Sequence, residues 1–333
     1  MATLRAGVIG LGSMGRHHAR VLRSLEGVEL VAVADAIGDA HGVAGGLPVG
    51  QDVDHLIAAG IDMAVVAVPT AEHERVGLAL AAAGVHTMVE KPIAENSAAG
   101  LRLAEAFESA GLVGAVGHIE RLNPALQEMR RRIEDGQLGA VYQVSTQRQG
   151  PFPGRIADVG VIKDLATHDI DLTAWVAQSD YVSVAAQTAH RSGRPHEDMI
   201  AATGILENGI ITSHLVNWLS PLKLRTTTVT GEKGALVADT ANADLTFYAN
   251  GTFVNEWETI ATFRGVTEGD VVRYALGKRE PLVLEHEAFR DAVLGRDDRV
   301  VTMREGLRTL EVAEAALESA RTGTTVALER VAS

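Results

Sequence analysis

The 333-residue chain has no cysteine, a deficit of positive charge and no long hydrophobic run. Without cysteine it forms no disulfide and offers no thiolate nucleophile or thiolate metal ligand. Its formal net charge of -13 would repel nucleic acid phosphates and anionic membrane surfaces, so we expect neither as a partner. No run approaches the ~20 apolar residues of a membrane span, and the first residues lack the pattern of a secretory signal. These absences favour a cytoplasmic protein.

The remaining composition is that of a globular protein long enough for two domains. Hydrophobic residues make up 46% of the chain and charged residues 22%, which is sufficient to bury a core in each domain. Residues 1–120 alternate short apolar runs with alanine-rich stretches of helical period, which predicts a parallel sheet with helices on both faces. After His118, runs that alternate polar and apolar residues predict an antiparallel sheet within residues 121–333.

The expected helices and strands follow from these periods. In residues 1–120 we expect strands at Ala6–Ile9, Leu30–Ala34, Met63–Val68, His86–Val89 and Val113–Val116, and helices at Met14–Leu25, Glu72–Ala83 and Ala98–Ala110. In residues 121–333 we expect helices at 124–135, 162–177, 285–294 and 304–320, and strands at 141–148, 182–190, 201–206 and 210–216. Tight turns are predicted at Glu207-Asn208-Gly209 and at Asn250-Gly251, because asparagine and glycine tolerate positive φ.

A glycine-rich motif joins the first expected strand to the first expected helix, with the sequence Gly10-Leu11-Gly12-Ser13-Met14-Gly15. Its glycines permit a tight turn and let a pyrophosphate approach the helix N-terminus, where backbone N–H groups favour an anion. Asp35 ends the second strand, where an acidic residue binds the adenosine ribose hydroxyls. Because this aspartate repels a 2′-phosphate and no cation follows it closely, the motif predicts NAD over NADP. The alternative is a glycine turn in an α/β domain that binds no nucleotide.

Two further segments, Val68-Pro69-Thr70 and Glu90-Lys91-Pro92, follow expected strands. Both lie at the carboxyl edge of the sheet, where open α/β folds bind their ligands. At this edge the ammonium of Lys91 could hydrogen-bond a substrate hydroxyl and stabilise the alkoxide that develops as hydride leaves. The alternative, for Lys91 taken alone, is a solvated loop residue.

A third group of polar residues lies in the expected helix at 162–177, where Asp164, His168 and Asp171 share one face. A histidine flanked by carboxylates can accept a proton near neutral pH while a carboxylate fixes its tautomer, as a general base requires. One alternative is a metal site, but the sequence has no second cluster at matched spacing. Another is a structural network of capping residues. The pattern favours a general base, and we expect no metal.

Taken together, these motifs resemble those of the glucose-fructose oxidoreductase, inositol dehydrogenase and rhizopine-catabolism (Gfo/Idh/MocA) oxidoreductases. The resemblance covers nearly the whole chain, and the union of the glycine motif with EKP and a downstream D-x-x-x-H is specific. Its marks are GVIGLGSMGRHHA at 7–19, VAVPTAEH at 66–73, VEKP at 89–92, GHIERLNPA at 117–125 and DLATHDID at 164–171.

The resemblance implies a Rossmann domain at 1–120, followed by an α/β domain at 121–333 with a large, open, mostly antiparallel sheet. It implies an active site between the two domains, in which Lys91 and His168 flank the reacting carbon and Asp164 assists. It also implies an NAD-dependent oxidoreductase that forms a homodimer or homotetramer through the sheet of the second domain.

The cofactor contacts expected from the motifs include several residues with competing structural roles. For His17, His18 and His73 a helix-surface or capping role is the favoured alternative, and for His118 a structural role is an equal alternative. We expect NAD to contact Gly10, Gly12, Ser13, Met14, Gly15, Asp35, Val68, Pro69, Thr70, His73, Glu90, Lys91 and His118.

The substrate that the resemblance implies is a secondary alcohol of a sugar, cyclitol or nucleotide sugar. The stretch GPFPGRIADVGVIKDLATHDID at 150–171 resembles members that oxidise the 3-hydroxyl of UDP-N-acetylglucosamine. Cations near the expected catalytic helix suit an anionic substrate, with scattered surface charge as the alternative. We expect substrate contacts from Lys91, Arg121, Asn123, Arg148, Arg155, Lys163, Asp164 and His168. The alternative functions are an inositol or free-sugar dehydrogenase, and an NAD- and sugar-binding regulator without catalysis.

Overall fold

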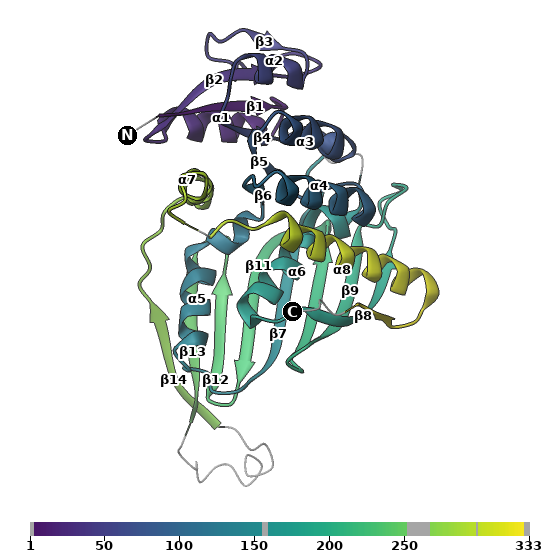
Figure 1. Ribbon diagram of the computed structural model, residues 1–333. Coiled ribbons are helices and arrows are strands. Elements are labelled where there is room, and N and C mark those ends of the chain that lie inside the picture. Colours follow the sequence, from purple (N-terminus) through teal and green to yellow (C-terminus); the bar gives the residue numbers. More distant parts are fainter. Residues whose placement is uncertain (1–2, 155–158, 252–266, 298, 330–333) are drawn as a thin grey trace. The chain divides into compact units, whose positions relative to one another are not determined.

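A computed structural model of the chain describes residues 3–154, 159–251, 267–297 and 299–329 (Figure 1). The chain divides into two compact units. Unit 1 comprises Met1–Ile119 and Glu280–Glu314, and unit 2 comprises Glu120–Arg279 and Ala315–Ser333. Across the described ranges, no helix combines the length and apolar character that crossing a membrane requires.

The two units interleave along the chain. The sequence places residues 280–314 in the second domain, whereas in the structure they pack within unit 1. Phe289 of this segment is fully buried in a core cluster with the strands of unit 1, and Thr302 forms a β-bridge with Ala115. A helical period indicates that one face of a helix is buried, but it does not indicate which domain buries that face.

Unit 1 is built on a six-stranded, fully parallel sheet in the order β3-β2-β1-β4-β5-β6. The order changes direction between β1 and β4, the position at which open α/β sheets bind dinucleotides. The five strands expected from the sequence are present, and only the two-residue β3 is not predicted, because it is too short to show a period. The strands are β1 (Leu4–Ile9), β2 (Val28–Ala34), β3 (Val49–Gly50), β4 (Met63–Val66), β5 (His86–Val89) and β6 (Gly114–Val116).

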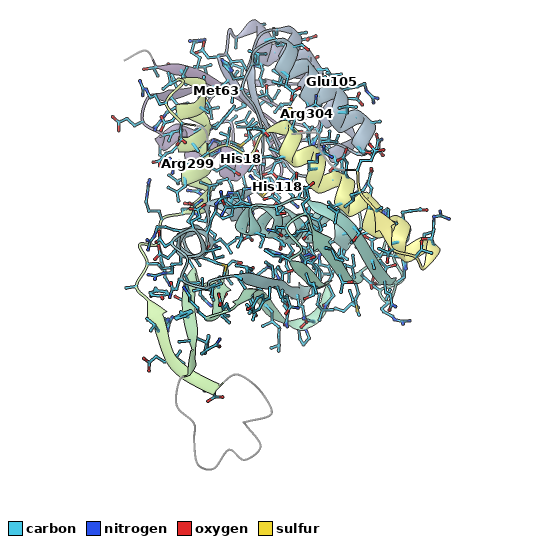
Figure 2. All side chains as sticks on the ribbon, turned by 60° about the horizontal axis from the view of Figure 1, so that its bottom comes forward. His18, Met63, Glu105, His118, Arg299 and Arg304 are labelled. Atoms are coloured by element: carbon cyan, nitrogen blue, oxygen red, sulfur yellow. The ribbon has the colours of Figure 1, made fainter. Side chains whose placement is uncertain are left out.

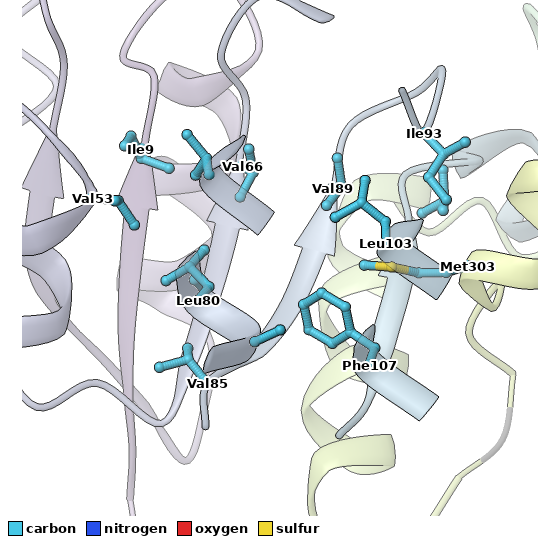
Figure 3. Packing of buried hydrophobic residues seen from close by; sticks show 14 of the residues in the cluster. Ile9, Val53, Val66, Leu80, Val85, Val89, Ile93, Leu103, Phe107 and Met303 are labelled. Carbon is cyan, nitrogen blue, oxygen red and sulfur yellow. The ribbon is translucent and has the colours of Figure 1, made fainter. Parts of the chain in front are cut away.

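Helices pack on both faces of this sheet. They are α1 (Gly15–Ser24), α2 (Val53–Ala58), α3 (His73–Ala82), α4 (Ser97–Ser109), α7 (Pro281–Val293) and α8 (Met303–Thr322), the last of which continues into unit 2. Successive residues of β4 enter different core clusters, since Val65 packs with the cluster that includes Phe289 and Val66 with the other. Figure 3 shows the other cluster, which includes Val66, Leu80 of α3 and Phe107 of α4, with Phe107 beside Met303. Each such side chain contributes about 1.5–3 kcal/mol through burial.

Unit 2 is built on a nine-stranded sheet in the order β14-β13-β12-β11-β7-β10-β9-β8-β15. All neighbours are antiparallel except β7 and β10, which pair in parallel. The expected large, open, mostly antiparallel sheet is therefore confirmed. The strands are β7 (Val141–Pro151), β8 (Tyr181–Ala189), β9 (Met199–Leu206), β10 (Ile211–Asn217), β11 (Leu219–Gly231), β12 (Gly234–Asp239), β13 (Asp244–Gly251), β14 (Thr267–Tyr274) and β15 (Val326–Ala327).

The helices of unit 2 lie against one face of its sheet (Figure 1). They are α5 (Pro124–Glu134), the π-helical turn η3 (Ile162–Ala166) and α6 (Thr167–Ala177), with the short 3-10 turn η2 (Ile119–Leu122) at the unit boundary. Along β7 the buried residues Val144, Thr146 and Arg148 alternate with more exposed ones, as a sheet covered on one face requires.

Apolar side chains are exposed on the strands of unit 2, among them Tyr142 on β7, Ile205 on β9 and Ile211 on β10. The alternation along these strands places the exposed positions on the face away from the buried core. The contact between copies of the chain that the resemblance implies stays a prediction.

The two turns predicted from the sequence have different outcomes. The turn predicted at Glu207-Asn208-Gly209 is confirmed between β9 and β10. The turn predicted at Asn250-Gly251 is wrong, because both residues belong to β13 and pair with Glu268 and Thr267 of β14. The connection between these strands lies outside the described residues.

Candidate functional site

The glycine-rich loop follows β1 and leads directly into α1, which begins at Gly15. Gly10 has a φ of +90°, and a Cβ atom there would lie 2.4 Å from the carbonyl oxygen of Ala67. A Cβ atom at Gly15 would lie 1.7 Å from the carbonyl oxygen of Gly10, so neither position accepts a side chain. At Gly12, which is exposed, a Cβ atom would meet no described atom within 4 Å. The loop is therefore open at Gly12.

The N-terminus of α1 lies at this loop. No described side chain caps it, and its first turn carries no acidic residue. Ser13 and Met14 are half-buried at the same end. Backbone N–H groups and the positive end of the helix dipole make this position suitable for a diphosphate, so the loop fits the pyrophosphate of a dinucleotide.

The Asp35 carboxylate is fixed beside the loop by three backbone hydrogen bonds. Its Oδ2 accepts the N–H of Leu11 at 2.7 Å, and its Oδ1 accepts those of Ile37 and Gly38 at 2.8 and 3.1 Å. A carboxylate has about four acceptor positions, so this half-buried group retains capacity for ribose hydroxyls. The geometry is compatible with the role expected for Asp35.

His73 joins the loops that follow β4 and β5. Its ring is almost fully buried, with Nδ1 3.0 Å from the Pro92 carbonyl oxygen and Nε2 3.0 Å from that of Val68. Burial lowers the pKa of His73 despite these carbonyls, so the neutral ring is favoured. A neutral ring donates from one nitrogen only, so His73 hydrogen-bonds one of these carbonyls and packs between the two loops expected to contact the cofactor.

Lys91 follows β5 at the carboxyl edge of the sheet and is half-buried. Its backbone N–H donates to Oε2 of Glu90 at 3.0 Å, and its peptide bond to Pro92 is cis. His118 follows β6, is 1% exposed, and its backbone N–H donates to the Val116 carbonyl at 2.7 Å. Both residues therefore lie at the ends of neighbouring strands, as the sequence predicts.

The Glu90 side chain turns into the interior of unit 1. Its Oε1 lies 2.8 Å from Nε2 of His18, and Nδ1 of His18 lies 2.9 Å from Nε2 of His286 on α7. His18 and His286 are fully buried, so the helix-surface role favoured for His18 is wrong; Figure 2 labels His18 within unit 1. The sequence gives no signal for His286, which is 268 positions from its partner.

The charges around Glu90 follow from this burial. Burial acts to raise the pKa of Glu90, but the interaction with His18 and the charge of Lys91 outweigh it and hold that pKa below its ordinary value. Burial, and then the nearby Glu90, raise the pKa of Glu285 well above its ordinary value. Burial, and then His18, lower the pKa of His286 well below its ordinary value. Glu90 is thus the carboxylate of this cluster, and His286 is neutral.

In unit 2, Asp164 lies in the π-helical turn and His168 in the first turn of α6. A π-turn inside a helix is rare and often marks a functional site. Asp164 is buried and His168 is half-buried, whereas Asp171 is bound by a distant arginine. Of the three residues of the expected face, Asp171 is therefore paired separately, and Asp164 and His168 lie in successive segments, the π-helical turn and α6.

Two buried arginines expected to contact substrate are held by carboxylates of unit 2. Arg121 donates to Asp171 at 2.9 Å from Nε and at 2.7 Å from Nη2. Arg148 donates to Asp169 and to Glu120, at 2.8 Å in each case. Burial disfavours its charge, but Asp169 and Glu120 outweigh that and raise the pKa of Arg148.

The remaining expected substrate contacts take different positions. Asn123 caps α5 by accepting the N–H of Ala125, and its amide donates to the Thr240 carbonyl. Lys163 is half-buried in the π-helical turn, beside Asp164. Arg155 lies outside the described residues.

Arg225 belongs to no motif of the sequence. This half-buried residue lies on β11 opposite Arg148 and donates from Nη1 to the carbonyls of Gln149 and Leu224. Burial, and then the charge of Arg148, lower the pKa of Arg225. An arginine in an alternating strand carries no motif, so only the strand pairing reveals its place in this charged group.

A hollow of about 600 Å³ lies over strands β7 to β10 and the C-terminal end of α8 in unit 2. Small polar residues such as Ser145, Thr203 and Ser213 contribute to its lining. None of the expected site residues that the structure describes lines it, so size alone does not mark it as the site of the chemistry. In the part of the chain that is described, no group of three His, Asp or Glu residues could hold a metal ion.

Comparison with known proteins gives matches over both parts of the chain. Residues 4–118 match a family model described as oxidoreductase family, NAD-binding Rossmann fold, and residues 126–237 match the GFO/IDH/MocA C-terminal domain. Inositol 2-dehydrogenase 2 of Saccharopolyspora erythraea is 31% identical over 98% of this chain and 96% of its own length. UDP-N-acetylglucosamine 3-dehydrogenase of Acidithiobacillus ferrooxidans is 30% identical over 88% of this chain and 90% of its own.

A solved structure extends these matches. The WlbA dehydrogenase from Bordetella pertussis, in complex with NADH and UDP-GlcNAcA, superposes with a TM-score of 0.80 at 26% identity. The match covers 98% of this chain and 99% of that chain.

Proposed function

Because the chain belongs to the Gfo/Idh/MocA family of NAD-dependent oxidoreductases, we propose that it oxidises the C3 hydroxyl of a UDP-N-acetylhexosamine. The observation that carries this choice is the similarity, over nearly the full chain, to a dehydrogenase solved with NADH and UDP-GlcNAcA. A curated UDP-N-acetylglucosamine 3-dehydrogenase at 30% identity supports the same substrate class. The second candidate is an inositol, favoured by the inositol 2-dehydrogenase that is 31% identical over 98% of the chain.

We propose that three side chains act on the substrate hydroxyl. His168 accepts its proton, and the ammonium of Lys91 stabilises the oxyanion that develops. Asp164, in the turn before His168, orients the imidazole or the substrate. Bound NAD supplies the hydride acceptor. Because both groups contact the same hydroxyl, the base removes its proton and the cation stabilises its oxygen in one transition state.

The internal ion pairs of unit 2 change which cations support an anionic substrate. Arg121 and Arg148 are each bound by carboxylates, so we assign them to the structure of unit 2. Lys163 is half-buried in the π-helical turn and keeps its proposed role as a contact of the diphosphate. Arg155 retains the same proposed role from its position in the sequence.

The substrate assignment is tested by NADH absorbance with UDP-N-acetylglucosamine, N-acetylglucosamine and myo-inositol. We expect turnover with the UDP-sugar, and for Lys163→Gln a KM about 10- to 100-fold higher, because a charge-assisted hydrogen bond contributes about 1.5–3 kcal/mol. Lys223→Gln, at an exposed lysine of β11, is the matched control and should leave the KM unchanged. Faster turnover of myo-inositol, with a KM insensitive to Lys163→Gln, would establish the second candidate instead.

The cofactor preference follows from Asp35. We expect NAD to bind more tightly than NADP, because the carboxylate held at Leu11 repels a 2′-phosphate. Replacing Asp35 by Ser and Ala36 by Arg should move the preference toward NADP, measured as the ratio of the two dissociation constants. Asp54→Ser, at an exposed aspartate of α2, serves as the control. Equal affinity of the native protein for both cofactors would contradict this role of Asp35.

A further inference from the structure

The cluster formed by Glu90, His18 and His286 has no role in the mechanism described above. It runs from the residue that precedes Lys91, through α1, to α7, and all its hydrogen bonds lie within unit 1. The two histidine rings meet edge to face, with centroids 5.1 Å apart. Both rings are fully buried and Glu90 is 9% exposed, so the cluster is largely shielded from water.

Hydrogen-bond accounting fixes the direction of this chain. Nδ1 of His286 is buried and has no hydrogen-bond partner among the described residues. A proton there would be left without an acceptor, at a cost of about 1–3 kcal/mol, so the neutral ring carries its proton on Nε2. That N–H donates to Nδ1 of His18, which must then carry its own proton on Nε2 and donate it to Glu90. Glu90 is therefore the final acceptor of this series of hydrogen bonds.

We propose that His286 and His18 form a one-directional hydrogen-bond chain that orients the Glu90 carboxylate, so that Glu90 positions Lys91. The other carboxylate oxygen of Glu90 accepts the backbone N–H of Lys91 at 3.0 Å, which ties the chain directly to that residue. His18, His286 and Glu90 are thus positioning residues. This inference rests on the proposed function only where it treats Lys91 as catalytic.

The charge beside Lys91 depends on every titratable group around Glu90. These groups come from three helices and from the loop itself, and they are His18 of α1, His73 of α3, Glu285 and His286 of α7, and Lys91. Burial lowers the pKa of His73 and of His286, and it raises that of Glu285, so these three groups favour their neutral forms. Glu90 is then the negative group of the set that faces Lys91.

The first test examines the hydrogen-bond chain in the absence of substrate. In protein labelled with ¹⁵N-histidine, the His18 ring should show a protonated Nε2 and an unprotonated Nδ1 at neutral pH. His286→Gln retains a side-chain N–H donor to Nδ1 of His18 and should preserve the native signals, whereas His286→Leu removes that donor and should shift the Nδ1 signal. His17→Gln, at the half-buried neighbouring position of α1, is the matched control and should leave the His18 signals in place. A His18 ring protonated on both nitrogens at neutral pH would overturn the proposed direction.

The second test reads the effect on Lys91. Glu90 accepts the His18 and Lys91 N–H groups through separate carboxylate oxygens, and an amide has only one oxygen. In Glu90→Gln kcat should therefore fall, while the KM for the sugar changes little. Glu90→Asp, which retains both carboxylate oxygens, should restore part of the turnover, and circular dichroism verifies that both variants fold.

A folded Glu90→Gln variant with the native kcat would overturn the link to Lys91. A native protein that turns over none of the offered substrates would contradict the proposed function. In that case the NMR test alone decides the hydrogen-bond chain, so the two failures are distinguishable.

Discussion

Replacement of His168 by alanine is expected to lower kcat about 100- to 10,000-fold, the usual cost of losing a general base. His168 lies in α6 of unit 2, whereas the glycine loop and Asp35 belong to unit 1, so NAD affinity should stay near the native value. Lys91→Met should lose turnover in the same range, because the developing oxyanion loses its cation. Steady-state kinetics and a cofactor titration measure both effects, and His190→Ala, at an exposed position after β8, is the control.

The double variant sharpens this expectation. Lys91→Met combined with His168→Ala should lose much less than the product of the two single losses, because the residues act as a unit on one hydroxyl. His168→Ala with near-native turnover across neutral pH would remove histidine from the mechanism. Lys91 would then be the base, and the Asp164–His168 face would be part of the scaffold.

Replacement of Arg148 by methionine is expected to lower the free energy of unfolding by about 3–5 kcal/mol, because it leaves buried carboxylates without their cation. Asp169 and Glu120 both bond to this guanidinium, and the Arg148 side chain is 5% exposed. Denaturant titration by circular dichroism measures the change. Arg131→Met removes ion pairs from an exposed arginine of α5 and should shift the midpoint far less.

A second variant separates charge from packing. Arg148→Met with Asp169→Leu should recover part of the lost stability, since one uncompensated buried charge is removed with its partner. If Arg148→Met proved as stable as the native protein while raising the KM for a UDP-sugar, Arg148 would be a substrate contact after all. The ion pairs seen within unit 2 would then be dispensable.

The sequence predicts the fold of unit 1 well because its signals are local. Short apolar strands buried on both faces, helices closed by glycine and a glycine loop before α1 each appear within a few residues of one another. It does less well for unit 2, where the turn expected at Asn250 is part of a strand. The same residues suit a turn and the end of a strand, and only the pairing with β14 decides between them.

The sequence likewise predicts part of the candidate site and misses the rest. The sequence predicts the positions of Lys91 at a strand end and of Asp164 and His168 on one helix, because spacing determines them. It cannot predict that Asp169 and Asp171, in the same motif, bind Arg148 and Arg121. Periodicity identifies which face of a helix is buried, but the partner on that face comes from a distant segment.

The most direct test of the central claim uses UDP-N-acetylglucosamine deuterated at C3, incubated with NAD and the native protein. If the chain transfers a hydride from that carbon, mass spectrometry will find the deuterium in the reduced cofactor and the 3-keto sugar as product. His168→Ala should form both at a rate lower by about 100-fold or more. Reduced cofactor without deuterium, or with deuterium only when an inositol is the labelled substrate, would contradict oxidation at C3 of the nucleotide sugar.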